Sequence, residues 1–263
     1  MRRVNLRTDL ETREDVTAHL AQTLEGLYST PPVPAELHGS REAALEALES
    51  FTARGYGGRN HVDASVSRLS AYLRHGVLSI TEVADHVRRV ARGRERDEFL
   101  KQLVWREFFM LVLEQEGTRV FDNLEPPKYP ARWTPNLPDD VREARTGLPC
   151  VDAWVTRLVT TGYMHNHERL WFAAYLTHWR RVHWRAGYTF FREHLLDGDI
   201  ASNALSWQWV ASTFSNKPYF MNQENIARYS ADRWCARCRV ACPFRKDYAT
   251  LEGELFGGAR FGA

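Results

Sequence analysis

The chain has 263 residues, 44% of them hydrophobic and 26% charged, and a formal net charge of +2. Its length allows one large domain or two small ones, with a sizeable core, and the near-balanced charge does not by itself indicate a nucleic-acid binder. No apolar run reaches the ~18–20 residues of a membrane span, and Met1–Leu10 lacks the apolar stretch of a secretory signal. We therefore exclude a membrane, exported or disordered protein and expect a cytoplasmic one.

The first half of the chain has the spacing of helices. Apolar residues recur at helical intervals in Leu10–Leu27, and Ser40 precedes a second helical run. Ser79 and Glu82 stand three residues apart before an apolar run, as in a capping box. The helical pattern continues through Phe99–Glu116, and alternating strand patterns are scarce. The sequence therefore predicts an all-α protein.

A proline-rich segment interrupts this pattern. Residues 125–140 contain five of the eleven prolines, which predicts a loop. We interpret it as a long surface loop inside a single domain that covers residues 1–263. After the loop, helices are expected over Val151–Thr160, Asn166–Arg185, Tyr188–Leu195 and Ala201–Ser212.

Two polar groups of residues are candidates for ligand binding. Ser65, Ser67 and Ser70 crowd a predicted helix start, where backbone N–H groups can bind a phosphate. Ordinary capping by serine explains the same pattern. Asp197 and Asp199 flank a glycine before another helix, where they can accept backbone N–H bonds. They can equally bind ribose hydroxyls or the N3–H of a flavin ring, although Asp-Gly-Asp is also a common cap and turn.

Four cysteines form the remaining chemical signal. Cys235, Cys238 and Cys242 are spaced Cys-x2-Cys-x3-Cys and are followed by Pro243, whereas Cys150 lies far upstream. Clustered cysteines in an intracellular chain favour a metal over disulfides. Four thiolates suit either a 4Fe-4S cluster or structural zinc, and the spacing alone favours zinc.

The order of several motifs resembles the FAD-binding helical domain of the photolyase/cryptochrome family. The resemblance covers roughly Ser40 to the C-terminus and implies FAD bound in a bent form inside an all-α bundle, without the family's α/β antenna domain. The matching motifs are Ser67-Arg-Leu-Ser70, Gly76-Val-Leu-Ser79, Trp105-Arg-Glu-Phe108, Thr146-Gly147, Val151-Asp152-Ala153, Gly162-Tyr-Met-His-Asn166, Trp184-Arg-Ala-Gly187, Leu196-Asp-Gly-Asp199, Asn203 and Trp207-Gln-Trp209-Val-Ala-Ser212.

The resemblance implies a set of FAD contacts. Asn203 would face the reactive flavin nitrogen and favour the fully reduced, anionic flavin. The residues implied at the phosphates are Ser67, Arg68, Leu69 and Ser70. The residues implied at the rings are Asn166, Arg169, Asp197, Asp199 and Asn203, with Arg106 as a further cofactor- or phosphate-binding residue.

The same resemblance assigns roles to tryptophans. Trp207 and Trp184 match the inner members of an electron-transfer chain, and the outermost member is either Trp133 or Trp179. Simple core packing is the alternative for each of them.

The lesion side of the site is implied in the same way. Trp105 and Trp209 match aromatic residues that clamp a flipped-out pyrimidine lesion. Gln102 stands where many photolyases have a glutamate that contacts the dimer. Lys217 is expected to contact DNA phosphates. The histidine pair of animal-type (6-4) photolyases is not matched, because Asn166 and Leu170 occupy those places.

For the cysteines, the resemblance favours a 4Fe-4S cluster over zinc. One upstream cysteine and three C-terminal ones resemble the iron–sulfur bacterial cryptochrome/photolyase branch, although the interval between Cys238 and Cys242 is shorter here. The cluster segment would cover residues 230–263.

Light-driven repair of pyrimidine dimers in single- or double-stranded damaged DNA is the function that the resemblance implies. The alternatives are a cryptochrome-like blue-light photoreceptor or redox sensor, and a DNA-binding protein that holds flavin and cluster without photochemistry.

Overall fold

The computed structural model describes residues 5–28, 35–257 and 259, and they form helices and loops. Within these residues the only extended pairing is an isolated bridge between Thr134 and Val182, and none of the helices is long and apolar enough to cross a bilayer. The predicted all-α class is confirmed. The chain divides into two compact units, Met1–His38 and Gly39–Ala263, and the expected single domain over residues 1–263 stays a prediction.

The first unit contains one described helix, α1 (Arg13–Thr23). Thr12 caps it by accepting a hydrogen bond from the Asp15 backbone N–H at 3.0 Å. The helix is shorter than the predicted 10–27 stretch and buries no side chain, and Leu27 beyond it is 77% exposed. Helical spacing therefore predicted the helix, but none of the described residues of its unit is buried, so α1 has no apolar core among them.

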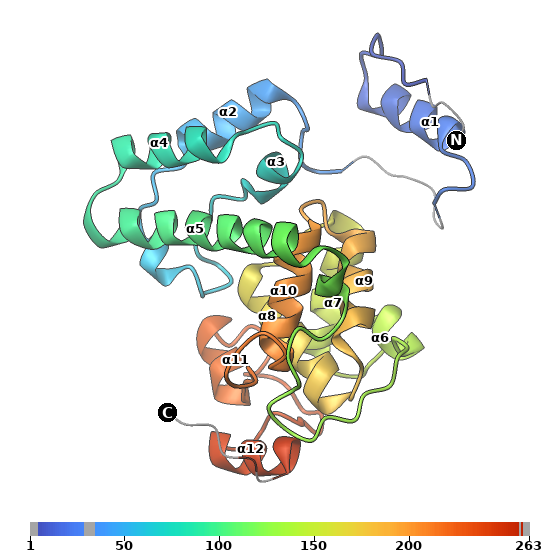
Figure 1. Cartoon of the computed structure of the whole chain (residues 1–263), viewed down its shortest axis with the longest axis vertical. Helices are drawn as coiled ribbons and strands as arrows, with labels where there is room; N and C mark the ends of the chain where they lie inside the picture. The colour runs from blue at the N-terminus through green and yellow to red at the C-terminus, as the bar shows by residue number, and fades with distance from the viewer. Residues whose placement is uncertain (1–4, 29–34, 258, 260–263) are drawn as a thin grey trace. The chain divides into compact units, whose positions relative to one another are not determined.

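The second unit contains the remaining helices (Figure 1). In chain order these are α2 (Arg41–Ser50), η1 (Tyr56–Gly58), α3 (Ser70–Arg74), α4 (Ile80–Val90), α5 (Gly93–Glu116), η2 (Gly117–Phe121), α6 (Asp139–Arg142), α7 (Pro149–Thr161), α8 (Asn166–Ala174), η3 (Tyr175–Trp179, a π-helical turn), α9 (Trp184–His194), α10 (Ile200–Ala211), α11 (Gln223–Tyr229) and α12 (Tyr248–Phe256).

Local capping signals act as the sequence predicts. The Ser40 side chain accepts a bond from the Ala43 backbone N–H at the start of α2. Ser79 and Glu82 form the capping box of α4, which satisfies two backbone donors reciprocally. Residues 122–138 contain no helix, as expected for the proline-rich loop, but α6 begins at Asp139, inside the predicted range of 125–140.

The helix predicted over Asn166–Arg185 is wrong in its second half. The chain leaves the α-helix after Ala174, makes one π-helical turn and reaches a positive φ of 54° at Arg181. Backbone bonds to the proline-rich loop hold this break: the Thr134 N–H donates to Arg181 O, and the His183 N–H donates to Thr134 O. A new helix then begins at Trp184, with the His183 ring as its cap. The break is decided by tertiary hydrogen bonds that helical periodicity does not contain.

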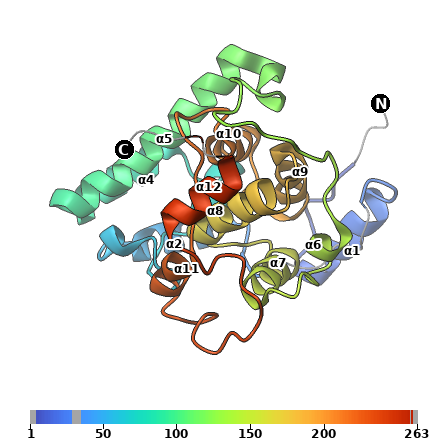
Figure 2. The same cartoon turned by 90° about the horizontal axis from the view of Figure 1, so that it is seen from below.

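The core of the second unit surrounds α10. This helix packs against α5, α8 and α9, while α5 also packs against α4 on its other side. Figure 1 shows α5 between α4 and the C-terminal helices, and Figure 2 shows α8 between α7 and α10. The largest fully buried side chains include Trp154, Trp171, Trp184 and Trp207. This arrangement leaves the N-terminal half of α10, the inner face of α5 and the start of α8 facing a common space.

Candidate functional site

A cavity of about 940 Å³ lies between α5, α8, α10 and the segment before α3. It gathers residues from positions as distant as Tyr56 and Asn216. Trp184 and Lys217 do not line it. The sequence-predicted residues in its walls are Ser67, Arg68, Leu69, Ser70, Gln102, Trp105, Arg106, Asn166, Arg169, Asp197, Asp199, Asn203, Trp207 and Trp209.

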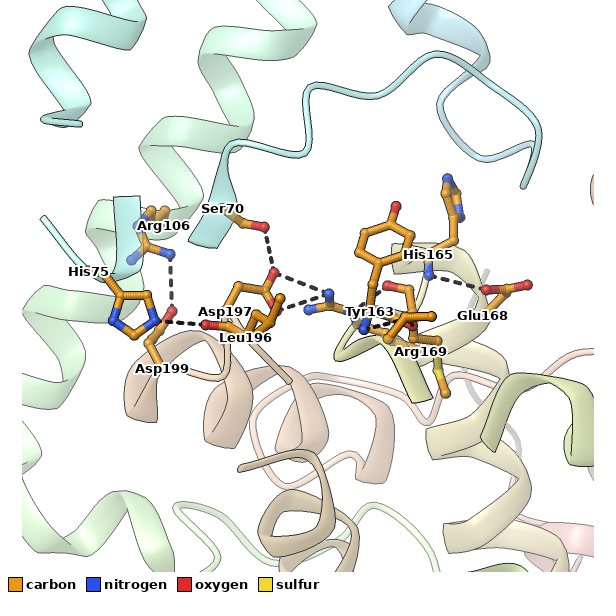
Figure 3. Close-up of polar contacts among 12 residues, drawn as sticks. Ser70, His75, Arg106, Tyr163, His165, Glu168, Arg169, Leu196, Asp197 and Asp199 are labelled. Atoms are coloured by element: carbon orange, nitrogen blue, oxygen red, sulfur yellow. Dashed lines mark hydrogen bonds and ion pairs between the residues drawn. The ribbon is translucent and has the colours of Figure 1, made fainter. Parts of the chain in front are cut away.

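Asp197 forms the buried acidic centre of this cavity. It accepts a hydrogen bond from the Ser70 hydroxyl at 2.5 Å and one from Arg169 Nη2 at 3.1 Å (Figure 3). Burial opposes the ionisation of Asp197, but the Arg169 charge and the two hydrogen bonds outweigh it and keep its pKa below the usual range. Arg169 is itself held by a bond from Nε to Met164 O at 2.8 Å. The pair is therefore ionised and fixed in position.

A second ion pair connects α5 with the start of α10. Arg106 Nη1 lies 3.0 Å from Asp199 Oδ2, and the two side chains are only 17% and 4% exposed (Figure 3). Asp199 also caps α10, because its Oδ1 accepts from the Ser202 backbone N–H. The cap predicted at Asp-Gly-Asp is confirmed, and the same carboxylate fixes Arg106 in the cavity wall.

Asn203 lines the cavity with a side chain that is held by the backbone. Its Nδ2 donates to Tyr188 O at 3.0 Å, and the residue is 8% exposed. This bond to the backbone of α9 uses one of the two N–H donors and fixes the carboxamide, so its oxygen and its second N–H are left for a ligand.

The segment before α3 is held in an unusual conformation. Arg68 has a positive φ of 52°, which a non-glycine residue rarely adopts. Its guanidinium lies 4.2 Å from the centre of the Tyr163 ring, which stabilises this conformation by a cation–π contact. Ser70 does not face the cavity as a free hydroxyl, because it donates to Asp197.

His165, which precedes Asn166, also lines the cavity. Its ring accepts a bond from the His167 backbone N–H at Nδ1, so the neutral ring keeps its proton on Nε2. Burial, helped by Arg169 and Arg157, lowers its pKa to about 4, so it is neutral near pH 7. Two further cavity residues, Tyr163 and Lys101, have no role assigned from the sequence. Tyr163 lies within the motif Gly162-Tyr-Met-His-Asn166, and the one sequence signal for Lys101 is that it precedes Gln102.

Two half-exposed indoles stand at the cavity mouth. Trp105 on α5 is 48% exposed and Trp209 on α10 is 41% exposed, although both line the cavity. Trp209 packs on Tyr219 with ring centres 5.6 Å apart. Gln102 lies on α5 about one turn before Arg106. Its side-chain Nε2 donates a hydrogen bond to Glu98 O at 3.4 Å. Large aromatic surfaces held open to solvent are available to stack on a ligand.

A series of aromatic rings leads away from the cavity. Trp207 lines the cavity, is buried and packs on the backbone of α9 at Gly187, one turn from Trp184. The His183 ring lies 5.4 Å from Trp184 and 5.2 Å from Trp133, between ring centres. The Trp179 indole instead donates to Pro243 O and packs on Phe244. Of the two candidates for the outermost tryptophan, Trp133 is thus the one joined to Trp184 through ring contacts.

The four cysteines are free thiols in one region of the second unit. Cys150 is buried at the start of α7, and burial, with smaller contributions from Cys235 and Cys242, raises its pKa to about 12. Burial likewise raises the pKa of Cys235 to about 11. Among the described residues no three histidine, cysteine or acidic side chains are grouped closely enough to hold a metal ion. Thiolates are suitable metal ligands, but these side chains are not grouped as a metal site in the described part of the chain. Residues 258 and 260–263 of the expected segment lie outside the described residues.

Comparison with known proteins finds similarity over more than half of this chain. Residues 99–244 match the family described as the FAD binding domain of DNA photolyase. A deoxyribodipyrimidine photo-lyase of Halobacterium salinarum is 38% identical over 164 residues, which are 59% of this chain and 34% of that protein. This chain therefore spans about a third of that relative.

Two solved structures resemble the fold over most of this chain. A Synechocystis cryptochrome superposes with a TM-score of 0.67 and 25% identity, covering 74% of this chain and 44% of its own. An archaeal photolyase from Sulfolobus tokodaii, whose structure contains two FAD molecules, superposes with a TM-score of 0.65 and 28% identity. The match covers 76% of this chain and 46% of that chain.

Proposed function

This chain belongs to the family of the FAD-binding domain of DNA photolyase, and we propose that it uses FAD and light to reverse pyrimidine dimers in DNA. The observation that supports the proposal most is the cavity itself, which combines a buried, ionised Asp197–Arg169 pair with half-exposed indoles at its mouth. One end suits a polar cofactor and the other suits a flat base. DNA as the partner and a cytoplasmic location both stay predictions.

The cavity fits FAD in size and in chemistry. Its volume of about 940 Å³ is at the upper end of ligand pockets, which are typically ~300–1,000 Å³. When bound, FAD would supply the absorption of light and the transfer of one electron. Asp197 and Arg169 would orient the cofactor as a fixed acceptor and donor. The free oxygen of Asn203 would accept a ring N–H, which favours the reduced flavin that carries that proton.

The mouth would hold the lesion. Trp105 and Trp209 would stack on a base that has left the duplex and replace the stacking that it loses. Gln102 would donate or accept a hydrogen bond at the base edge without adding charge. Arg106 is already paired with Asp199. The exposed Lys217 is therefore the better candidate for a contact with DNA phosphates.

Removal of one indole from the mouth tests this assignment. Trp209→Ala is expected to weaken the binding of UV-damaged oligonucleotide by about 5- to 150-fold, because stacking contributes ~1–3 kcal/mol per base. Fluorescence anisotropy with the folded variant measures the change. Tyr248→Ala, which removes an exposed aromatic residue from α12, is the control and should bind as the wild type does. Equal affinities for all three proteins would contradict a lesion pocket at Trp209.

Trp207, Trp184 and Trp133 would return an electron to the cavity from the surface. The inner two are buried, and Trp133 lies beyond the His183 ring. This arrangement also supports the alternative function, a cryptochrome-like photoreceptor or redox sensor, because photoreduction needs the same rings. A cryptochrome is among the similar structures.

A repair assay separates the two functions. The reduced protein is illuminated with oligonucleotides that carry cyclobutane or (6-4) lesions, in single and double strands, and restored bases are measured against a dark control. We expect light-dependent restoration of at least one lesion type. No restoration of either lesion, by a protein that binds FAD and photoreduces it, would contradict repair and favour the sensor.

We also propose that Cys150, Cys235, Cys238 and Cys242 bind a 4Fe-4S cluster, with zinc as the alternative. Burial raises the pKa of Cys150 and Cys235, so a metal must displace their protons, and its affinity should rise with pH. The metal would connect the start of α7 to the segment that follows α11.

Metal analysis of anaerobically purified protein tests this site. We expect about four iron and four sulfide per chain, and Cys235→Ser should lose the metal and lower the melting temperature. Ser230→Ala, in the same segment, is the control and should keep its metal. Stoichiometric zinc without iron would contradict the cluster and support the alternative, and absence of both metals would contradict the site.

A further inference from the structure

We propose that Asn123 favours the transfer of positive charge from Trp207 to Trp184, by accepting a hydrogen bond from the Trp184 indole. The inference rests on the proposed function, because Trp207 must first lose an electron to photoexcited flavin. It concerns a residue outside the cavity that contacts neither the cofactor nor DNA in the proposed arrangement. Asn123 would therefore be a positioning residue that acts through Trp184.

The two buried indoles of the series differ in what their N–H groups contact. Trp184 is 0% exposed, and its Nε1 donates to Asn123 Oδ1 at 2.7 Å. The Nε1 atom of Trp207 is buried and has no hydrogen-bond partner among the described residues. Trp184, unlike Trp207, thus has a polar partner that can respond to a charge on its ring.

The position of Asn123 is held by the residue next to Trp184. The Arg185 guanidinium donates to Phe121 O and pairs with the Asp122 carboxylate. Consecutive residues of α9 therefore bind consecutive residues of the loop that follows η2. Asn123 itself is exposed, so its carboxamide is the group between a buried indole and solvent.

Loss of an electron strengthens this hydrogen bond. One electron would pass from Trp207 to the photoexcited flavin, and one electron from Trp184 would then refill Trp207. The oxidised Trp184 keeps its N–H proton, because a carboxamide is not a base, and the N–H becomes part of a cation. Hydrogen bonds from charged donors are roughly twice as strong as neutral ones, which would favour charge on Trp184 over Trp207 by about tenfold.

The other titratable groups around Trp184 do not oppose this charge. The His183 ring lies beside the indole, and burial lowers its pKa, so it is neutral near pH 7. Asp122 and Arg185 form an ion pair with each other and add no net charge. The Asn123 oxygen is therefore the polar group that distinguishes Trp184 from Trp207.

Two substitutions of opposite effect test the proposal by transient absorption of the FAD-loaded protein. In Asn123→Leu, the amount of oxidised tryptophan that survives recombination should fall about tenfold, because the extra stabilisation of the charge is lost. Asn123→Asp is nearly isosteric and keeps a hydrogen-bond acceptor. In this variant the amount of oxidised tryptophan that survives recombination should be at least as large as in the wild type. In the dark, the indole proton resonance of Trp184, assigned with Trp184→Phe, should move upfield in Asn123→Leu only.

The outcomes separate this inference from the proposed function. If Trp207→Phe abolishes photoreduction but Asn123→Leu leaves the charge-separated yield unchanged, the role of Asn123 is overturned and the electron route stands. If Trp207→Phe leaves photoreduction intact, the route itself fails and the inference fails with it. Equal losses in Asn123→Leu and Asn123→Asp would point to loop disruption and also overturn it.

Discussion

Replacing Arg169 by leucine is expected to lower the free energy of unfolding by about 3 kcal/mol, because it leaves the Asp197 carboxylate buried without its counter-charge. The Asp197 side chain is 8% exposed, and Ser70 would be its one remaining side-chain partner. FAD binding should be lost as well, since both members of the pair line the cavity. Denaturant unfolding of the flavin-free protein and flavin titration measure the two effects separately.

The double variant Arg169→Leu, Asp197→Asn is the control for this prediction. It removes the charge as well as its partner, so most of the lost stability should return while FAD binding stays weak. If the double variant is no more stable than Arg169→Leu, the uncompensated charge is not the cause of the loss.

The difference in stability between the wild type and Arg169→Leu should depend on pH in a definite direction. In the wild type the pKa of Asp197 is depressed, so its contribution to stability is present above the unfolded pKa of about 3.9 and is lost as the pH falls through the lower folded pKa. In Arg169→Leu, burial dominates and raises this pKa, so the carboxyl folds protonated at acidic pH. The stability difference between the two proteins should therefore narrow as the pH falls from 7 towards about 4. A constant difference over that range would count against this account.

Gly187→Ala is expected to have the second large effect, because a methyl group at this position would overlap Cη2, Cζ3 and Cζ2 of Trp207. The indole is rigid and buried, so either it or α9 must shift, at a cost of about 1–3 kcal/mol. Displacement of Trp207 from the cavity wall should also lower the yield of flavin photoreduction. Thermal unfolding and continuous illumination with a chemical reductant measure the two quantities.

Gly253→Ala provides a matched substitution with the opposite expected sign. Gly253 lies inside α12, and a methyl group there would meet no atom within 4 Å. Alanine in a helix interior is favoured over glycine by about 0.5–1 kcal/mol, so this variant should be slightly more stable than the wild type. If Gly187→Ala is as well tolerated as Gly253→Ala, Trp207 is not held against α9 as described.

Local features of the fold were predictable because they depend on neighbouring residues. The caps at Ser40 and Ser79 involve a side chain and a backbone N–H three residues away, and the proline-rich loop follows from missing backbone donors. The break after Ala174 was not predictable. It depends on bonds between Thr134 and residues 181 and 183, nearly fifty positions away.

The candidate site divides in the same way. Residue types and the order of motifs were sufficient to select the aspartates, Asn203 and the tryptophans, since each motif is short and chemically distinctive. Only the tertiary structure decided that Ser70 donates to Asp197 across 127 positions, that Arg106 pairs with Asp199, and that Trp184 reaches Asn123. Such contacts depend on how helices pack, and packing is a property of the whole core that no local pattern of residues encodes.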